Sequence, residues 1–220
     1  ILSQFGFGAT IDFDDVTHKG ITNISTDDVA VAQELGYVIK LVGDVREVES
    51  GISAEVSPTF LPKNHPLASV NDVMNAVFVE SIGIGESMYY GPGAGQKPTA
   101  TSVLADIIRI ARRLSDGNVG KPFNEFRRDL PLANPADVKS NYYFALDTPD
   151  EKGKILHLSE IFNSEDISFE QVLQQKANGT TARIVVITHA MSKTQLKAVT
   201  EKLEAAEDFT VVNTLKVLSN

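Results

Sequence analysis

The stretch Tyr142–Asp147, with the sequence YYFALD, decides the fold of the last part of the chain. Its aromatic and aliphatic residues favour a β-strand. The turn Thr148–Gly153 follows directly, and apolar residues then recur at the spacing of one helix face. These apolar residues are Ile155, Leu156, Leu158, Ile161 and Phe162.

Three more strands and a second helix complete this pattern. The strands are predicted at Ile167–Leu173, Ala182–Thr188 and Phe209–Val217, and Ser192 begins the helix that precedes the last one. The order is therefore βαββαβ over residues 141–220, which predicts the split βαβ sandwich of the ferredoxin-like class. Such a fold does not by itself determine a function.

Residues 1–120 predict a separate α+β domain with a mixed sheet and helices on one side. Ser25 is expected to cap a helix that ends at Gly36. The expected strands are Ile21–Ile24, Tyr37–Val45, Ser53–Phe60, Ala76–Glu80 and Ser87–Tyr90. Glycines and prolines then mark residues 121–140 as a linker.

The first residues predict the end of a helix without its beginning. Residues 1–8 (ILSQFGFG) carry a glycine stop signal but no preceding cap. We therefore expect the chain to be a fragment of a longer protein.

Composition limits the classes of function. The hydrophobic fraction of 42% and charged fraction of 22% are typical of a soluble globular protein, and no apolar run has the length of a membrane span. The net charge of −9 argues against a nucleic-acid partner, and the pairs Arg112-Arg113 and Arg127-Arg128 are interpreted as solvated surface. The 4 scattered histidines offer no metal-ligand spacing. The absence of cysteine fits a cytoplasmic protein without disulfides.

The segment Tyr89–Thr99 (YYGPGAGQKPT) places three glycines at alternate positions before a helical pattern. Glycines let another group approach the backbone, and the first N–H groups of a helix attract an anionic or strongly accepting group. The alternative is a tight turn that packs a strand against a helix, and the composition leaves both interpretations open. The dinucleotide fingerprint G-x-G-x-x-G is broken at Pro98, so we expect a cofactor pyrophosphate to be held elsewhere.

The helix after this glycine loop is expected to begin at Thr99 as N-cap and to pack through a broad apolar stripe. The stripe consists of Val103, Leu104, Ile107, Ile108, Ile110, Ala111 and Leu114.

A series of short motifs runs in order through the first 120 residues. The motifs are Gly20-Ile21, Asp27-Asp28, Glu34-Leu35-Gly36-Tyr37, Ile39-Lys40-Leu41, Asn75-Ala76-Val77, Tyr90–Gly95, Pro98-Thr99-Ala100 and Ala105-Asp106. This series closely resembles bacterial homoserine dehydrogenases. The resemblance implies reduction of aspartate 4-semialdehyde to L-homoserine with NADPH or NADH, on the route to threonine, methionine and isoleucine.

The same resemblance implies which residues touch the cofactor. Gly91, Gly93, Ala94, Gly95 and Thr99 match the family's loop beside the cofactor, near the substrate. The Rossmann domain and the catalytic Asp and Lys are expected upstream of Ile1, so this chain alone should be inactive and contains no catalytic residue of its own. The residue that selects NADP or NAD would lie in that upstream domain. Lys40 also matches a position of the family, but we assign it no role.

Residues 141–220 resemble an ACT domain, a small-molecule regulatory module found in many amino-acid biosynthetic enzymes. The resemblance implies an effector site between two such modules in a homodimer or higher oligomer. Because the implied pathway leads to threonine, L-threonine is the expected effector. The matching residues are Asp147, Asp150, Gly153, Lys154, Ile155, Asn163, Ile167 and Ser168. The usual Pro-Gly pair is replaced by Lys152-Gly153, which leaves two alternatives: the loop binds an amino acid, or the module serves dimerisation only.

Overall fold

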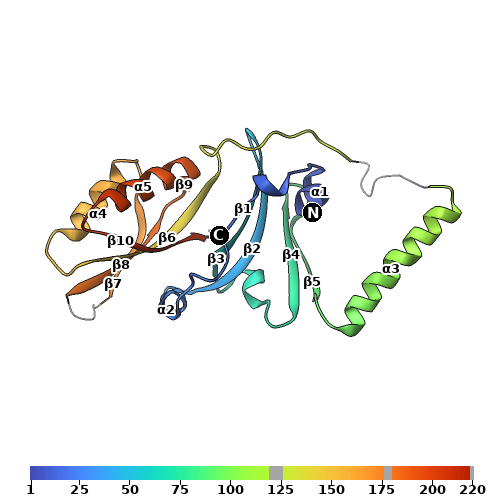
Figure 1. The fold of residues 1–220 in the computed structure, drawn as a ribbon, viewed down its shortest axis with the longest axis horizontal. Coiled ribbons are helices and arrows are strands. Elements are labelled where there is room, and N and C mark those ends of the chain that lie inside the picture. Colours follow the sequence, from blue (N-terminus) through green and yellow to red (C-terminus); the bar gives the residue numbers. More distant parts are fainter. Residues whose placement is uncertain (119–125, 176–179, 219–220) are drawn as a thin grey trace. The chain divides into compact units, whose positions relative to one another are not determined.

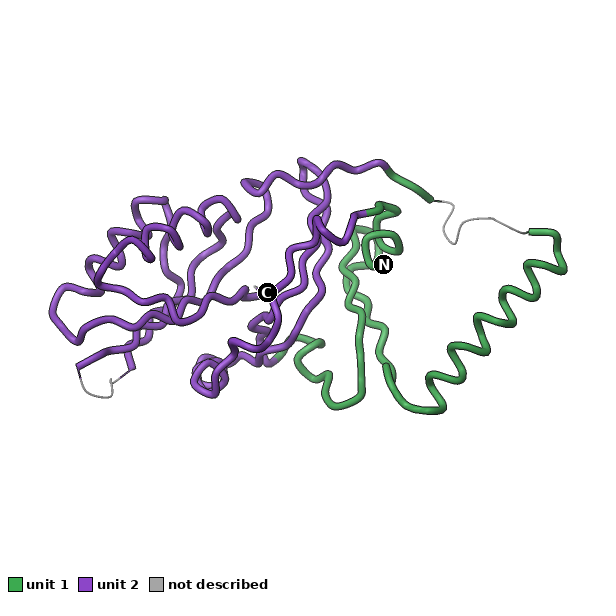
Figure 2. The backbone as a smooth tube through the Cα atoms, viewed as in Figure 1, with its two compact units in different colours: residues 1–10, 64–128 green, residues 11–63, 129–220 purple. Residues whose placement is uncertain are grey.

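The computed structural model describes residues 1–118, 126–175 and 180–218. Contacts divide the chain into two compact units, shown in separate colours in Figure 2. The first unit contains residues 1–10 and 64–128, and the second contains residues 11–63 and 129–220. Each unit is described by itself.

The second unit is built on a mixed sheet that the described residues form from eight strands. The strand order is β1-β3-β10-β6-β8-β7, with β2 paired to β3 and β9 paired to β6. The strands are β1 (Thr17–His18), β2 (Tyr37–Val48), β3 (Gly51–Pro62), β6 (Lys139–Pro149), β7 (Phe169–Gln175), β8 (Thr181–Thr188), β9 (Met191–Ser192) and β10 (Thr210–Val217). A short 3₁₀ turn, η1, covers Phe13–Asp15.

The predicted βαββαβ unit is confirmed within this sheet. Its elements follow in the order β6, α4 (Lys154–Asn163), β7, β8, α5 (Lys193–Ala205) and β10. Spatial order β10-β6-β8-β7 is that of the split βαβ sandwich. Both helices cover the same face of the strands (Figure 1), where Phe144 and Leu146 of β6 pack in one core with Leu158, Phe162 and Leu203.

The opposite face of the same strands is covered by α2 (Thr26–Glu34), a helix from the early part of the chain. Val31 and Ala32 of α2 form a second core with Tyr143 and Ala145 of β6. Successive side chains of a strand point to opposite faces, so alternate residues of β6 enter different cores. The strand is therefore buried on both faces, as its continuous apolar sequence requires.

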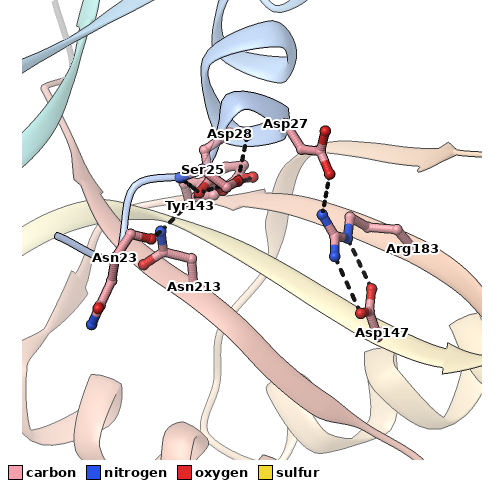
Figure 3. Close-up of polar contacts among 8 residues, drawn as sticks. All are labelled: Asn23, Ser25, Asp27, Asp28, Tyr143, Asp147, Arg183 and Asn213. Atoms are coloured by element: carbon pink, nitrogen blue, oxygen red, sulfur yellow. Dashed lines mark hydrogen bonds and ion pairs between the residues drawn. The ribbon is translucent and has the colours of Figure 1, made fainter. Parts of the chain in front are cut away.

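A buried polar cluster fixes the start of α2 against the sheet (Figure 3). Ser25 and Asp28 form a capping box, which confirms the predicted cap. The Asp28 carboxylate also accepts hydrogen bonds from the Tyr143 hydroxyl at 2.9 Å and from the Asn213 amide at 3.0 Å. Burial opposes the charge of Asp28, but these hydrogen bonds outweigh it and lower the pKa of its carboxyl group.

Pairing between β3 and β10 joins the early strands to the βαββαβ unit. These strands run parallel, with Lys216 opposite Thr59 and Val217 opposite Phe60. Contacts therefore divide the chain at different places from the sequence-based division into residues 1–120, 121–140 and 141–220. That division remains a prediction about modules, and residues 121–125 of its linker lie outside the described residues.

The first unit contains a two-stranded antiparallel sheet, β4 (Met74–Ser81) with β5 (Gly85–Pro92), as the sequence predicts. Helix α1 (Leu2–Phe7) ends at Gly8, whose left-handed φ of 68° confirms the glycine stop. The other elements are the short 3₁₀ turn η2 (Pro66–Ser69) and the long helix α3 (Gln96–Ser115).

Two expectations about local structure are wrong. Residues 21–24 form turns instead of a strand, because Ile24 packs into the core beneath α2 instead of pairing. Helix α3 begins at Gln96 with Gly95 as its N-cap, four residues before the predicted N-cap Thr99, and Pro98 is tolerated within its first turn.

The predicted packing of α3 is also absent from the described residues. None of its residues is buried, and most of the apolar stripe is exposed. The exposed stripe residues are Val103, Leu104, Ile107, Ile108, Ile110 and Leu114. The amphipathic pattern predicts that a helix has an apolar face, but not which surface covers it.

A buried ionic cluster lies where β2, β3 and β10 meet. Asp44 and Glu55 stand directly opposite each other on β2 and β3, and Lys216 of β10 contacts both carboxylates. The Lys193 ammonium lies 2.8 Å from the other oxygen of Glu55. Burial alone would raise the pKa of Glu55, but the charge of Lys216 and the hydrogen bond from Lys193 lower it to about 2.

We predict that Glu55→Gln removes a pH-dependent part of the stability. A carboxyl group whose pKa is lowered by folding stabilises the protein above its unfolded pKa, and this contribution disappears as pH falls toward the folded value. Here the window runs from about pH 4.5 to about pH 2. Free energies of unfolding should show that the wild-type protein loses on the order of 3 kcal/mol more than the variant across this window.

The control is Glu204→Gln, which changes an exposed glutamate of α5. This control should keep the pH dependence of the wild-type protein. Equal slopes of stability against pH for the wild type and Glu55→Gln would contradict the assigned role of the ionic cluster.

Candidate functional site

The glycine loop lies between β5 and α3. Gly91 of β5 pairs with Asn75 of β4, one residue before the end of the strand, and the Gly93 N–H donates to the Val73 carbonyl at 3.0 Å. Gly95 has a φ of 120°, a conformation that glycine adopts without strain, and this turns the chain into α3. Ala94 and Thr99 are exposed on the loop and in the first turn of the helix.

Gly93 lies directly against a side chain of the same hairpin. A Cβ atom built on Gly93 would overlap the side-chain amide of Asn75. By contrast, a Cβ atom built on Gly91 meets no atom within 4 Å. The glycines of this loop therefore serve different purposes: Gly93 makes room for Asn75, whereas Gly91 leaves open space.

The N-terminus of α3 faces the loop without a capping side chain. The first turn is closed by the Thr99 N–H, which donates to the Gly95 carbonyl at 3.0 Å. No acidic residue lies in this turn, and Gly95 makes no side-chain cap. N–H groups at such a helix start lack partners within the helix and favour an anionic or accepting group. The loop and the start of α3 thus offer backbone N–H groups to a molecule that approaches them.

The second candidate site is a cavity of about 310 Å³ at the start of α4. Gly153 is the N-cap of α4, with a left-handed φ of 91° and no capping side chain. From the loop and helix, Gly153, Lys154 and Ile155 line the cavity. The sheet contributes Thr148 of β6, and Ala182 and Ile184 of β8.

Charges at the rim of this cavity are paired with one another. The Lys154 ammonium lies 3.0 Å from Asp208 and 3.3 Å from Glu151, and the hydrogen bond to Asp208 raises the pKa of Lys154. His157 Nδ1 lies 2.9 Å from the other oxygen of Asp208, and this contact lowers the pKa of the Asp208 carboxyl group. These contacts hold the start of α4 near the turn before β10.

Asp147, expected to bind an effector, has its side chain on the other face of β6. Arg183 donates to both Asp147 carboxylate oxygens, at 2.8 Å and 3.2 Å, and its remaining guanidinium nitrogen lies 3.3 Å from Asp27 of α2 (Figure 3). Asp150 is exposed and uses its N–H to bind the Thr180 carbonyl. Neither aspartate lines the cavity.

The remaining predicted effector residues lie at the other end of α4. Asn163 is the last residue of the helix, and Ile167 is buried in the core beneath it. Ser168 is exposed, and its carbonyl accepts a hydrogen bond from the His189 N–H. Because a helix rises about 1.5 Å per residue, roughly 15 Å separate Asn163 from Gly153 at the start of α4. Of the predicted effector residues, one copy of the chain brings only Gly153, Lys154 and Ile155 to the cavity.

Sequence reasoning missed the residues that the sheet contributes to both sites. Thr148 shares a face of β6 with Leu146, so the alternation of the strand carried a signal for it. The packing of Asn75 above Gly93 depends on the register of the hairpin, which local composition does not specify. Within the described ranges, no group of three or more His, Cys, Asp or Glu side chains could hold a metal ion, and no helix combines the length and apolar character that crossing a membrane requires.

Comparisons with known proteins point to one family. The family model described as "Homoserine dehydrogenase" matches residues 1–108. A homoserine dehydrogenase from Lactococcus lactis is 58% identical over 220 residues, which cover 100% of this chain and 51% of that protein. One from Corynebacterium glutamicum is 36% identical over 220 residues, covering 98% of this chain and 49% of that protein.

Solved structures give the same result. The crystal structure of a homoserine dehydrogenase from Thiobacillus denitrificans has a TM-score of 0.89 and 30% identity, covering 99% of this chain and 51% of that chain. The crystal structure of a homoserine dehydrogenase from S. aureus at pH 6.0 has a TM-score of 0.69 and 25% identity. The match covers 99% of this chain and 51% of that chain. The chain spans about half the length of the curated relatives that it matches.

We predict a coupling between Gly93 and Asn75. Gly93→Ala forces the exposed side-chain amide of Asn75 to rotate away, and a side chain held off its preferred rotamer costs about 0.5 to 1.5 kcal/mol. In an Asn75→Ala background the added methyl group has room, so the same substitution should cost about 0.5 kcal/mol or less. Hydrogen exchange of the amides of β4 and β5 measures both effects locally. Additive effects of the two substitutions would contradict this packing.

Proposed function

The chain belongs to the homoserine dehydrogenase family, and we propose that it forms the C-terminal half of an enzyme that reduces L-aspartate 4-semialdehyde to L-homoserine. The observation that carries this proposal is the match of the family over residues 1–108, a range that includes the whole glycine loop. NADPH or NADH would supply the hydride. The nucleotide-binding domain and the catalytic Asp and Lys are expected in the other half, so residues 1–220 alone should be inactive.

The glycine loop fits a position against the cofactor. Gly91, Gly93, Ala94, Gly95 and Thr99 would lie beside it, and the uncapped N-terminus of α3 offers N–H donors without a nearby acidic side chain. The open space above Gly91 allows a close approach to the backbone. In the reaction this loop would position the cofactor and exclude water, while proton transfer is left to the other half.

The exposed stripe of α3 supports the idea that more of the enzyme packs on this chain. Isolated globular proteins rarely expose a contiguous apolar patch of this kind. The relatives are about twice as long as the chain, so we infer that the stripe is covered within the complete enzyme. Such an enzyme would be cytoplasmic, act on a small molecule, and bind neither nucleic acid nor membrane.

A second candidate function is that of an amino-acid-binding and dimerising regulatory module. The cavity at Gly153 supports it, because an uncapped helix start can hold a carboxylate while Ile155 and Ile184 offer an apolar wall. Asn163 and Ser168, which are exposed, would reach this cavity only from a second copy, which fits a homodimer or higher oligomer. L-threonine, an end product of the pathway, is the proposed effector.

For the enzyme, we predict that Gly91→Val impairs cofactor binding without damaging the fold. The new side chain meets no atom of this chain within reach of its Cβ, but it would occupy the approach path of the cofactor. Steady-state kinetics of the full-length protein should show semialdehyde-dependent oxidation of NADPH or NADH. The variant should lower kcat/KM about 100-fold, as expected when reacting groups are misplaced by about 1 Å.

Gly83→Ala is the matched control, because this glycine of the β4–β5 turn also has open space and an ordinary φ. It should leave kcat/KM unchanged. A full-length protein without activity on the semialdehyde would refute the proposed reaction, whereas wild-type kinetics for Gly91→Val would refute only the position of the loop.

For the regulatory module, we predict that L-threonine raises the melting temperature of the protein in a saturable way. A ligand at a hundred times its Kd adds about 2.7 kcal/mol to the stability of the folded state. D-Threonine serves as the control and should produce no shift. The absence of a shift with L-threonine and with every other amino acid of the pathway would leave dimerisation as the remaining role of the module.

A further inference from the structure

The side chain of Asn75 lies at the glycine loop without a hydrogen-bond partner. Its amide group occupies the position that a Cβ atom on Gly93 would take, so it packs directly against the backbone of the loop. Asn75 is nevertheless exposed, and its side-chain amide makes no hydrogen bond within the parts of the chain that the structure describes. Both its N–H donors and its acceptor oxygen are therefore available to a molecule beside the loop.

The register of the β4–β5 hairpin determines what surrounds this amide. Asn75 pairs with Gly91, and residues directly opposite each other in an antiparallel pair lie on the same face. A Cβ atom on Gly91 would meet no atom within 4 Å, so the backbone opposite the amide is open. Val77 and its partner Tyr89 follow on this face and are 42% and 71% exposed. The amide thus stands at the end of an open surface of glycine backbone and apolar side chains.

The chemistry of this surface matches one end of the proposed cofactor. A side-chain amide is neutral and both donates and accepts hydrogen bonds, so it complements a second carboxamide. Phosphate oxygens only accept hydrogen bonds, so a phosphate would place a negative group against the acceptor oxygen of Asn75. Nicotinamide carries a carboxamide on a flat ring, and open glycine backbone allows such a ring a close approach. The residues at the loop therefore fit the nicotinamide end of NADPH or NADH.

We propose that Asn75 binds the nicotinamide end of the cofactor, and that its side-chain amide hydrogen-bonds to the nicotinamide carboxamide. The inference rests on the proposed dehydrogenase function and deepens it. It adds a residue of β4, outside the loop residues that the family resemblance implies. Asn75 would orient the ring that carries the hydride.

The test compares the cofactor, NADPH or NADH, with its 3-acetylpyridine analogue, in which a methyl group replaces the carboxamide nitrogen. Isothermal titration calorimetry of the full-length wild-type protein should give a Kd for the cofactor about fivefold or more below that for the analogue. The reason is that the analogue lacks the N–H that the Asn75 oxygen accepts. Asn75→Ala removes this acceptor and should lower the ratio of the two Kd values about fivefold. Binding is measured without substrate, so the result does not depend on turnover.

Two further variants separate the hydrogen bond from other effects of the substitution. Asn75→Asp keeps an acceptor oxygen at the same reach, so it should retain the wild-type ratio. It should bind both compounds more weakly, because a carboxylate cannot donate to the carbonyl group that they share. Asn64→Ala is the matched control, since Asn64 is another exposed asparagine of the same compact unit. It should leave both Kd values unchanged.

Failure of the inference differs from failure of the proposed function. If Asn75→Ala keeps the wild-type ratio of the two Kd values, Asn75 does not bind the carboxamide, and the inference is overturned while the proposed reaction stands. Unchanged Kd values with a raised KM for the semialdehyde would assign the amide to the substrate instead, which also overturns the inference. If the wild-type protein binds neither NADPH nor NADH, the proposed function fails, and the inference fails with it.

Discussion

Tyr143 is the residue on which the second unit depends, because it connects three segments that lie far apart in the sequence. Its ring stacks on Phe60 of β3 with 4.5 Å between centroids, and its hydroxyl donates to Asp28 at 2.9 Å. Burial and the nearby Asp28 carboxylate raise the pKa of the tyrosine, so the hydroxyl remains a donor. Strand β6 therefore requires both α2 and β3 to bury its second face. The βαββαβ unit and the early strands consequently share one core.

This sharing brings the proposed effector cavity close to elements that lie within residues 1–108, the range that the family model matches. Asp147 and Thr148 are neighbours on β6 and serve opposite faces: Asp147 contacts α2 through Arg183, and Thr148 lines the cavity. A ligand at the cavity would thus touch a strand whose other face holds α2. Elsewhere in the sheet, Lys216 joins β10 to Asp44 of β2 and Glu55 of β3 through the ionic cluster. Both sets of contacts connect residues of the predicted module 1–120 with residues of the predicted module 141–220.

Much of this fold could be predicted from the sequence, because the deciding signals are local. The YYFALD strand, the Ser25 cap and the glycine stops at Gly8 and Gly36 follow from residue type and spacing. The cover of β6 by α2 could not be predicted, because an apolar strand requires a cover without specifying which segment supplies it. The Asn75 contact with Gly93 is likewise a tertiary feature, which depends on strand register.

The central claim, that α2, β6 and β10 form one cooperative unit, is tested most directly by native-state hydrogen exchange of the full-length protein. This measurement gives the free energy of opening for each backbone amide. Our account predicts that the slowest amides of α2, such as Val31, open with the same free energy as those of Phe144 and Leu215 in β6 and β10. Exchange of α2 through a separate opening of much lower free energy, with β6 and β10 still protected, would contradict the shared core.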